Sequence, residues 1–333
     1  MANLKRLSPE QQLKLANLRS RFVPRQCFHE LSDAICNLED RRRVEISEGL
    51  HPEARGLAVI GNSGSGKSTG LGHFFRKSGT LSLLADGNDT AAVASFLVPS
   101  PATLKGVGIS CLSGLGYPLM RDRTAGIIWQ LVQGHLRELK VMFLHLDEAQ
   151  DLMGSQSKPE MVAVVNTLKG VMQNPQWPVS IILSGLPDLL TLLNLDTQLG
   201  RRFAPIYFSP LNDVDDGRNV RSLVCQYCAA IAVAPDPELQ SDDFISRLIH
   251  AAANEFGILI EIVIGAIEIC IRRDETILAK QHFVAEFLRR TGCANDLNPF
   301  VRTNFTAIDP MVLLPGHNDS SSLGTPKQRD RKK

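Results

Sequence analysis

Between residues 56 and about 210, short apolar runs alternate with segments whose apolar residues recur at helical spacing. The apolar runs predict strands, and they are the stretches GLAVIG, AAVASFLVPSP, VMFLHLDEAQ, PVSIILSGLP and APIYFSPL. The segments between them predict helices, among them STGLGHFFRKSG, TAGIIWQLVQGHLRELK and PEMVAVVNTLKGVMQN. Strands that alternate with helices form a parallel sheet covered on both faces. The pattern therefore predicts an α/β fold for this part of the chain.

The pattern changes on either side of this part. The first 55 residues predict a helical leader of mixed charge, in which Ser8-Pro9-Glu10-Gln11 is a typical helix start. After about residue 210 the strand-like runs give way to four helical segments, and after about residue 292 the chain becomes polar and ends in basic residues. We therefore expect a leader (1–55), a nucleotide-binding domain (56–210), a helical lid (211–292) and a mostly disordered tail (293–333).

Composition narrows the class of protein only slightly. The chain has 333 residues, of which 44% are hydrophobic and 21% charged, as in a soluble protein with more than one core. The net charge of +1 gives no general attraction for DNA, so DNA binding would need local basic patches. The longest apolar stretch, GILIEIVIGAIEICI, is shorter than the roughly 20 residues of a membrane helix and contains two glutamates. No membrane partner is expected.

The N-terminus and the cysteines favour a cytoplasmic location. The first residues, MANLKRLSPEQQLKLANL, lack the apolar segment of a secretory signal. Seven cysteines, an odd number in a chain without such a signal, suggest reduced thiols. Cys225 and Cys228 have the spacing of zinc ligands, but no second pair follows, so we expect them on an apolar helix face. The charged run Leu38–Glu45 is expected to be solvated.

One stretch, GNSGSGKS, matches the phosphate-binding pattern G-x-x-x-x-G-K-[ST]. It follows a predicted strand and opens a predicted helix, so that loop N–H groups and the helix N-terminus can surround phosphate oxygens. Lys67 is expected to reach the β- and γ-phosphates and Ser68 to hold Mg²⁺. The alternative is a glycine-rich surface turn. The residues predicted to bind the nucleotide are Gly61, Asn62, Ser63, Gly64, Ser65, Gly66, Lys67, Ser68 and Thr69.

A pair of acids ends the apolar run VMFLHLDEAQ. Asp147 is expected to bind Mg²⁺, directly or through water, and Glu148 to polarise the water that attacks ATP. Small-molecule kinases with this loop need no such glutamate, so the pair favours ATP hydrolysis. The alternative is a charged strand end that faces solvent. The cofactors predicted are ATP and Mg²⁺.

Other polar residues lie near predicted strand ends. Ser184 is either a partner of the attacking water or γ-phosphate, or an ordinary strand-end serine. In ring-forming ATPases an arginine placed like Arg201 or Arg202 reaches the neighbouring subunit's nucleotide; the alternative is a helix C-terminal cap. His145 is expected to be a core histidine rather than a catalytic one. Gln150 either senses the γ-phosphate or caps the next turn.

Together these elements resemble the AAA+ superfamily and, more narrowly, the TniB/TnsC family of transposition ATPases. The narrower resemblance covers about residues 30–290 and depends on VPSPATLKGVGISCLSGLGYP, IILSGLPDL and QLGRRFAPIYFSPL. It implies a P-loop NTPase (AAA+/ASCE) sheet sandwiched by helices and followed by an all-helical lid. The third lid helix has Glu261 where many AAA+ members have an arginine that touches the γ-phosphate. We therefore expect hydrolysis to be slow.

The resemblance also implies a function. Members of the family bind ATP, oligomerise on duplex DNA as a ring or filament, recruit or activate a transposase, and disassemble on hydrolysis. Lys105, Arg121 and Arg123 would lie on the DNA-facing side, the alternative being solvated surface charge. Two other functions fit the residues: a nucleotide-gated scaffold with negligible turnover, and an AAA+ ATPase of a secretion system or other complex that does not act on DNA.

Overall fold

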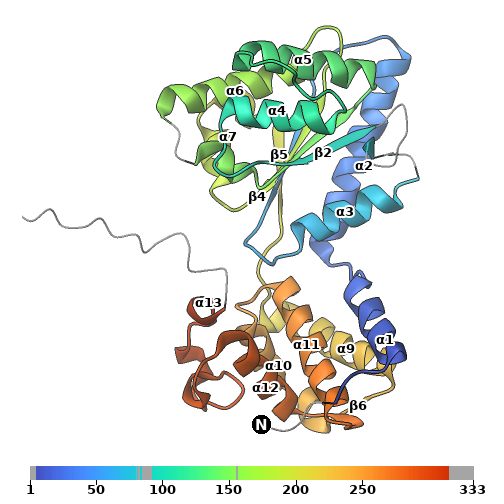
Figure 1. Ribbon diagram of the computed structural model, residues 1–333, viewed down its shortest axis with the longest axis vertical. Coiled ribbons are helices and arrows are strands. Elements are labelled where there is room, and N and C mark those ends of the chain that lie inside the picture. The colour runs from blue at the N-terminus through green and yellow to red at the C-terminus, as the bar shows by residue number, and fades with distance from the viewer. Residues whose placement is uncertain (1–4, 80, 82, 85–91, 155–156, 315–333) are drawn as a thin grey trace, which may run out of the picture. The chain divides into compact units, whose positions relative to one another are not determined.

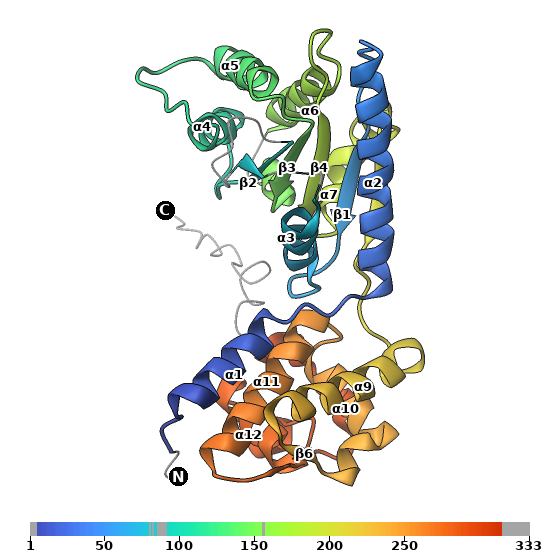
Figure 2. The same cartoon turned by 90° about the vertical axis from the view of Figure 1, so that its right-hand side faces the viewer.

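The computed structural model describes residues 5–79, 81, 83–84, 92–154 and 157–314 (Figures 1 and 2). Contacts divide the chain into two units, one of residues Phe22–Ser209 and the other of Met1–Arg21 with Pro210–Lys333. The predicted leader is split between them, because α1 (Pro9–Ser20) belongs to the second unit and α2 (Gln26–Ser47) to the first. The chain passes from one unit to the other within a few residues.

The first unit is built on a five-stranded sheet in the order β2-β3-β4-β1-β5. The strands are β1 (Gly56–Ile60), β2 (Val93–Leu97), β3 (Phe143–Asp147), β4 (Ser180–Gly185) and β5 (Phe203–Tyr207). All neighbouring strands are parallel. These are the five apolar runs predicted from the sequence, and the α/β fold class is confirmed. Because β4 lies between β1 and β3, the carboxyl ends of these three strands meet at one edge.

Helices cover both faces of this sheet, because successive strand residues point to opposite sides. On one face, α2 and α3 (Lys67–Lys77) pack against side chains such as Val59, Phe143 and Ile182. The other face carries α4 (Leu104–Gly114), α5 (Ala125–Glu138), α6 (Lys158–Met172), α7 (Leu189–Asn194) and α8 (Thr197–Gly200). Figure 2 shows α2 along one side of the sheet and α4, α5 and α6 on the other.

The long helix α2 contains the charged run Leu38–Glu45, which the sequence predicts to be solvated. This prediction is wrong for Glu39 and Arg42, whose exposed fractions are 4% and 2%. The Arg42 guanidinium lies 5.3 Å from the centre of the Trp177 ring, where a delocalised cation packs well. A run of charges does not reveal which of its members face the sheet, so the sequence could not separate these two from the rest.

The second unit is mainly helical. Its longer helices are α1, α9 (Asp213–Ile231), α10 (Asp242–Ala251), α11 (Phe256–Arg272) and α12 (Lys280–Thr291). The four helices predicted after residue 210 are therefore present. A short parallel pairing of β6 (Ala234–Pro235) with β7 (Ile277–Leu278) joins the segment after α9 to the segment between α11 and α12. The sequence did not indicate this pairing. None of the helices in the described part of the chain is long and apolar enough to cross a membrane.

Residues 295–314, which the sequence places in the disordered tail, pack onto this helical unit. Asn298 and Phe300 are buried. Arg247 on α10 donates hydrogen bonds to the carbonyl oxygens of Pro299 and Arg302 at 2.7 and 2.6 Å. A buried arginine thus holds a segment whose low apolar content suggested disorder. The segment ends in α13 (Pro310–Leu313), and the rest of the predicted tail, residues 315–333, lies outside the described residues.

We expect Arg247→Met to lower the free energy of unfolding by about 3 kcal/mol, because buried carbonyl oxygens would lose their donor. Urea denaturation of the full chain measures this. Arg218→Met removes an exposed arginine from α9 and serves as the control, with an expected change within about 0.5 kcal/mol. Equal losses for the two variants would contradict this role of Arg247.

Candidate nucleotide-binding site

The loop between β1 and α3 has a backbone that requires glycine. Gly64 and Gly66 have φ angles of +79° and +98°, which side chains disfavour. A Cβ atom on Gly61 would lie 2.8 Å from the carbonyl oxygen of Phe208. Gly66 gives α3 no side-chain cap, so backbone N–H groups of the first turn point toward the loop. A helix start of this kind suits an anion.

The side chains of the loop also fit a phosphate ligand. Lys67 is 7% exposed, and its Nζ donates to the carbonyl oxygens of Gly61 and Asn62 at 2.7 and 2.9 Å. These contacts hold the ammonium group over the loop. The Oγ of Ser65 is buried without a hydrogen-bond partner among the described residues. A buried hydroxyl without a partner needs an explanation, and a ligand bound in the loop supplies one.

Two hydroxyls and a carboxylate meet beside this loop. Ser184 at the end of β4 donates to Asp147 Oδ1 at 2.5 Å, and Ser68 on α3 also hydrogen-bonds the Asp147 carboxylate. Burial alone would raise the pKa of Asp147, but the hydrogen bonds from Ser184 and Ser68 outweigh it, and the pKa lies below its ordinary value. Asp147 is therefore ionised. Carboxylate and hydroxyl oxygens are ligands that Mg²⁺ accepts, so Ser68 and Asp147 fit the ion.

Glu148 is held beside this group by Gln150, which lies on the 3₁₀ helix η2 (Ala149–Met153). Gln150 Nε2 donates to Glu148 Oε2 at 2.8 Å, and Gln150 Oε1 accepts from the N–H of Leu186 at 3.1 Å. Glu148 has φ +55°, in the left-handed region that side chains rarely adopt. Backbone strain of this kind is concentrated at functional sites. Gln150 therefore ties the carboxylate of Glu148 to the end of β4.

His145 is buried on the sheet face that α3 covers, with its ring centre 5.8 Å from that of Phe75. Both ring nitrogens are hydrogen-bonded, Nδ1 to Ser95 Oγ at 2.8 Å and Nε2 to Ser184 Oγ at 2.7 Å. Burial lowers the pKa of His145 to about 4, against the opposing effect of Asp147, so the imidazole is neutral near pH 7. It is a core residue, but the sequence did not indicate its connection to Ser184.

Arg201 and Arg202 lie at the amino end of β5, whereas the other candidate residues lie at the carboxyl ends of their strands. The Arg202 side chain is 10% exposed, and its Nη2 lies 2.6 Å from the carboxylate of Glu53. Arg201 is exposed, and its carbonyl oxygen accepts from Arg55 Nη1 at 2.9 Å. β5 is parallel to β1, so its amino end is far from the phosphate loop of the same chain. Neither arginine therefore joins the other candidate residues within one chain.

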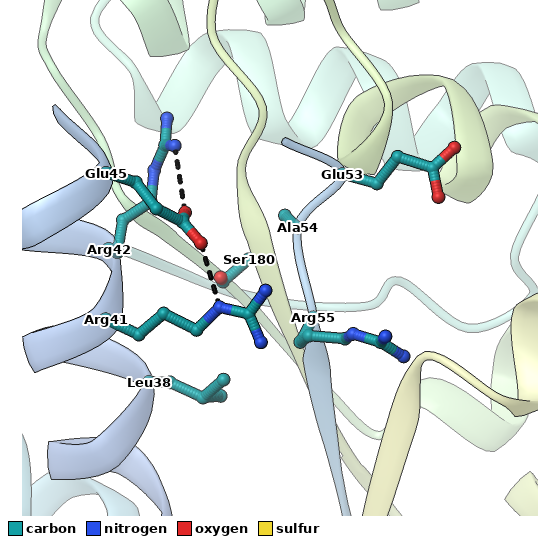
Figure 3. Close-up of a pocket in the computed structure, with 8 residues that line it drawn as sticks. All are labelled: Leu38, Arg41, Arg42, Glu45, Glu53, Ala54, Arg55 and Ser180. Carbon is teal, nitrogen blue, oxygen red and sulfur yellow. Dashed lines mark hydrogen bonds and ion pairs between the residues drawn. The ribbon is translucent and has the colours of Figure 1, made fainter. Parts of the chain in front are cut away.

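A small cavity lies between α2 and the amino end of β1 (Figure 3). Its lining consists of Leu38, Arg41, Arg42, Glu45, Glu53, Ala54, Arg55 and Ser180. In Figure 3 the carboxylate of Glu45 lies between two arginines, with Arg41 Nε at 2.8 Å and Arg42 Nη1 at 3.4 Å. The cavity volume of about 10 Å³ suits one water molecule. It is too small for a nucleotide.

Of the three basic residues considered for DNA, Lys105 lies in the first turn of α4, and Arg121 and Arg123 lie in the connection from α4 to α5. Lys105 Nζ lies 2.5 Å from the carboxylate of Asp122. Arg121 and Arg123 flank this aspartate and are exposed. Met120, the residue before them, is 91% exposed. The connection therefore presents two arginines and an apolar side chain to solvent.

The sequence model of the bacterial TniB protein family matches residues 23–212. The chain belongs to the TniB family. The match spans the phosphate loop, Asp147 and Ser184, and it confirms the resemblance inferred from the motifs. The search of curated proteins finds no match to this chain.

Solved structures with the same fold include Orc and Cdc6 proteins. The Orc1 protein of Aeropyrum pernix in complex with DNA has a TM-score of 0.57 at 12% identity, over 84% of this chain and 69% of that one. The ORC2 protein of Aeropyrum pernix in ADPNP–ADP complexes has a TM-score of 0.55 at 13% identity, over 80% and 69%. Cdc6p of Pyrobaculum aerophilum has a TM-score of 0.52 at 15% identity, over 81% and 69%. At such identities the likeness shows the fold alone: a parallel sheet with helices on both faces, together with a helical part.

Proposed function

We propose that this protein is a cytoplasmic ATPase that assembles on duplex DNA with ATP, recruits or activates a transposase there, and disassembles on hydrolysis. The observation that carries the proposal is that the family match and the candidate site residues lie in the same part of the chain. The segment that matches the TniB family also brings Lys67, Ser68 and Asp147 together at one edge of the sheet. The Orc1 protein with the same fold was solved in complex with DNA, which supports the proposal that this chain also binds DNA.

Each site residue has a role in the proposed reaction. Lys67 and the loop N–H groups would hold the triphosphate, and Ser68 and Asp147 would hold Mg²⁺. When bound, Mg²⁺ neutralises charge on the transferred phosphoryl group. Glu148 would orient the attacking water as a general base. Gln150 donates to Glu148 Oε2 in this structure, and the carboxylate keeps Oε1 and further lone pairs with which to accept from that water. Slow hydrolysis remains part of the proposal because the third lid helix has Glu261 where many AAA+ members have an arginine.

Arg201 is the better candidate for a contact with a neighbouring subunit's nucleotide, since Glu53 holds Arg202. We expect Arg201→Ala to lower DNA-stimulated ATP hydrolysis about 10- to 100-fold, the worth of one charge-assisted hydrogen bond, without a change in melting temperature. Arg202→Ala is the matched variant, and it should lower the melting temperature. Hydrolysis and thermal unfolding are measured on both proteins. If Arg201→Ala keeps full activity and Arg202→Ala loses it in a folded protein, the assignment is wrong.

The connection between α4 and α5 is proposed to contact DNA phosphates. We expect the double variant Arg121→Ala/Arg123→Ala to bind DNA more weakly and to show a flatter dependence on salt. The slope of log K against log salt should fall by about 0.9 for each DNA phosphate that the variant no longer neutralises. Arg76→Ala/Lys77→Ala removes the same charge from exposed positions of α3 and should leave the slope unchanged. Fluorescence anisotropy of a labelled duplex gives both slopes, and equal slopes would contradict the proposal.

The recruitment step is tested with a purified transposase as the probe. DNA beads carrying the assembled protein should retain the transposase with ATP and release it with ADP. Retention in both nucleotide states, or in the absence of this protein, would contradict ATP-gated recruitment. If the protein never binds DNA but still binds ATP and an unrelated protein complex, an AAA+ ATPase that does not act on DNA becomes the better account.

A further inference from the structure

Four polar side chains form a continuous line of hydrogen bonds across three neighbouring strands. The contacts run from Ser95 Oγ to His145 Nδ1 at 2.8 Å, from His145 Nε2 to Ser184 Oγ at 2.7 Å, and from Ser184 Oγ to Asp147 Oδ1 at 2.5 Å. The strand register explains the alignment. Ser95 is paired directly with His145, and Ser184 lies two residues beyond Ile182, the partner of His145 on β4. The line therefore depends on the sheet rather than on a loop.

The direction of every hydrogen bond follows from the carboxylate at the end of the line. Ser184 donates its single hydroxyl hydrogen to Asp147 Oδ1, which accepts it. Ser184 Oγ can then only accept from His145, and Nε2 must carry the imidazole hydrogen. Nδ1 is consequently an acceptor, and Ser95 donates to it. Each hydrogen bond in the line therefore has one donor and one acceptor.

This direction limits what Ser184 can do. A serine hydroxyl has one hydrogen, and Ser184 already gives it to Asp147. It cannot donate at the same time to a γ-phosphate or to an attacking water. In this arrangement Ser184 therefore acts on the orientation of Asp147, and the residue that fixes the rotation of the Ser184 hydroxyl is His145.

We propose that His145 is a positioning residue for the Mg²⁺ site: it directs the Ser184 hydroxyl to Asp147 Oδ1 and so holds the carboxylate in the orientation that binds the ion. The inference rests on the proposed ATPase function. His145 acts only through Ser184, because its ring is buried and both of its nitrogens are occupied. Groups that orient a metal ligand are typically worth about 10- to 100-fold in metal affinity or activity.

The chain offers variants that separate this role from simple core packing. His145→Leu keeps an apolar side chain of moderate size but removes the donor to Ser184. His145→Gln retains an N–H group near the position of Nε2 and should restore the function. Ser184→Ala removes the hydroxyl that His145 acts through. Ser95→Ala removes only the far end of the line and leaves the contact between His145 and Ser184 in place.

The first measurement is binding of a fluorescent ATP analogue to the full chain, in a Mg²⁺ titration and in EDTA. For His145→Leu and Ser184→Ala we expect the Mg²⁺ concentration at half-saturation to rise about 10- to 100-fold, with the affinity in EDTA unchanged. His145→Gln and Ser95→Ala should stay within a few-fold of the wild type. The double variant His145→Leu/Ser184→Ala should be no worse than either single one. Additive losses, or an equal loss in EDTA, would overturn the proposal.

The second measurement uses the nucleotide-free protein. NMR spectra of the ¹⁵N-histidine-labelled chain, with His145 identified by its absence in His145→Gln, should show a protonated Nε2 and a bare Nδ1 near pH 7. The opposite tautomer, in which Nε2 has no hydrogen to donate to Ser184, would overturn the role of His145 even if ATP binding is intact. If the wild-type chain binds no ATP with or without Mg²⁺, the proposed ATPase function fails, and the role of His145 fails with it.

Discussion

Replacing Glu148 by glutamine is expected to lower the rate of ATP hydrolysis by about 100- to 10,000-fold, the usual worth of a general base. Binding of ATP with Mg²⁺ should persist, because the residues that fit the phosphates and the ion are Lys67, Ser68 and Asp147. Glutamine has nearly the same shape and still offers an oxygen to Gln150. The substitution therefore removes the base and keeps the site.

Phosphate release and equilibrium binding of ATP, measured on the same preparation, test this expectation. Under the proposed function, Glu148→Gln should also prolong the lifetime of the protein on DNA, because hydrolysis is the step that ends the assembly. Glu138→Gln, an exposed glutamate of α5, is the control and should leave every quantity unchanged. Hydrolysis at the wild-type rate in Glu148→Gln would assign the base to another residue.

Replacing Lys67 by alanine is expected to weaken ATP binding by at least about 100-fold. Lys67 is 7% exposed, and its ammonium group donates to the carbonyl oxygens of Gly61 and Asn62, so it is already placed over the loop before a ligand arrives. Charge-assisted hydrogen bonds to phosphate oxygens are each worth about 1.5–3 kcal/mol, and the variant loses more than one.

Isothermal titration with ATP measures this loss. Lys77→Ala removes an exposed lysine from the other end of the same helix and should bind ATP like the wild type. Far-ultraviolet circular dichroism of both variants checks that the fold persists. If Lys67→Ala binds ATP as tightly as Lys77→Ala, the loop from Gly61 to Ser68 is not the phosphate site.

The parts of the structure that could be predicted from the sequence are those encoded by local patterns. Each strand of the sheet is a short apolar run between turn residues, and each follows or precedes a helix with its own periodicity. The phosphate loop is likewise local, because Gly64 and Gly66 supply the φ angles and Lys67 follows directly. A single short window contains all the information that such a feature needs.

The parts that could not be predicted depend on which distant residues become neighbours. His145 contacts Ser95 and Ser184 only because β3 lies between β2 and β4, and nothing in the apolar runs indicates that order. The distinction between Arg201 and Arg202 depends on Glu53, which is remote in sequence. Packing of residues 295–314 depends in the same way on one buried arginine of α10.

The most direct test of the central claim is co-sedimentation of the full chain with duplex DNA, with ATP, with ADP and without nucleotide. The account predicts that the protein sediments with DNA only when ATP is present. Lys67→Ala should fail to sediment in every condition, and Glu148→Gln should remain with the DNA after the wild type has dissociated. Binding that is equal in all nucleotide states, or no DNA binding in any of them, would contradict the claim that ATP controls assembly on DNA.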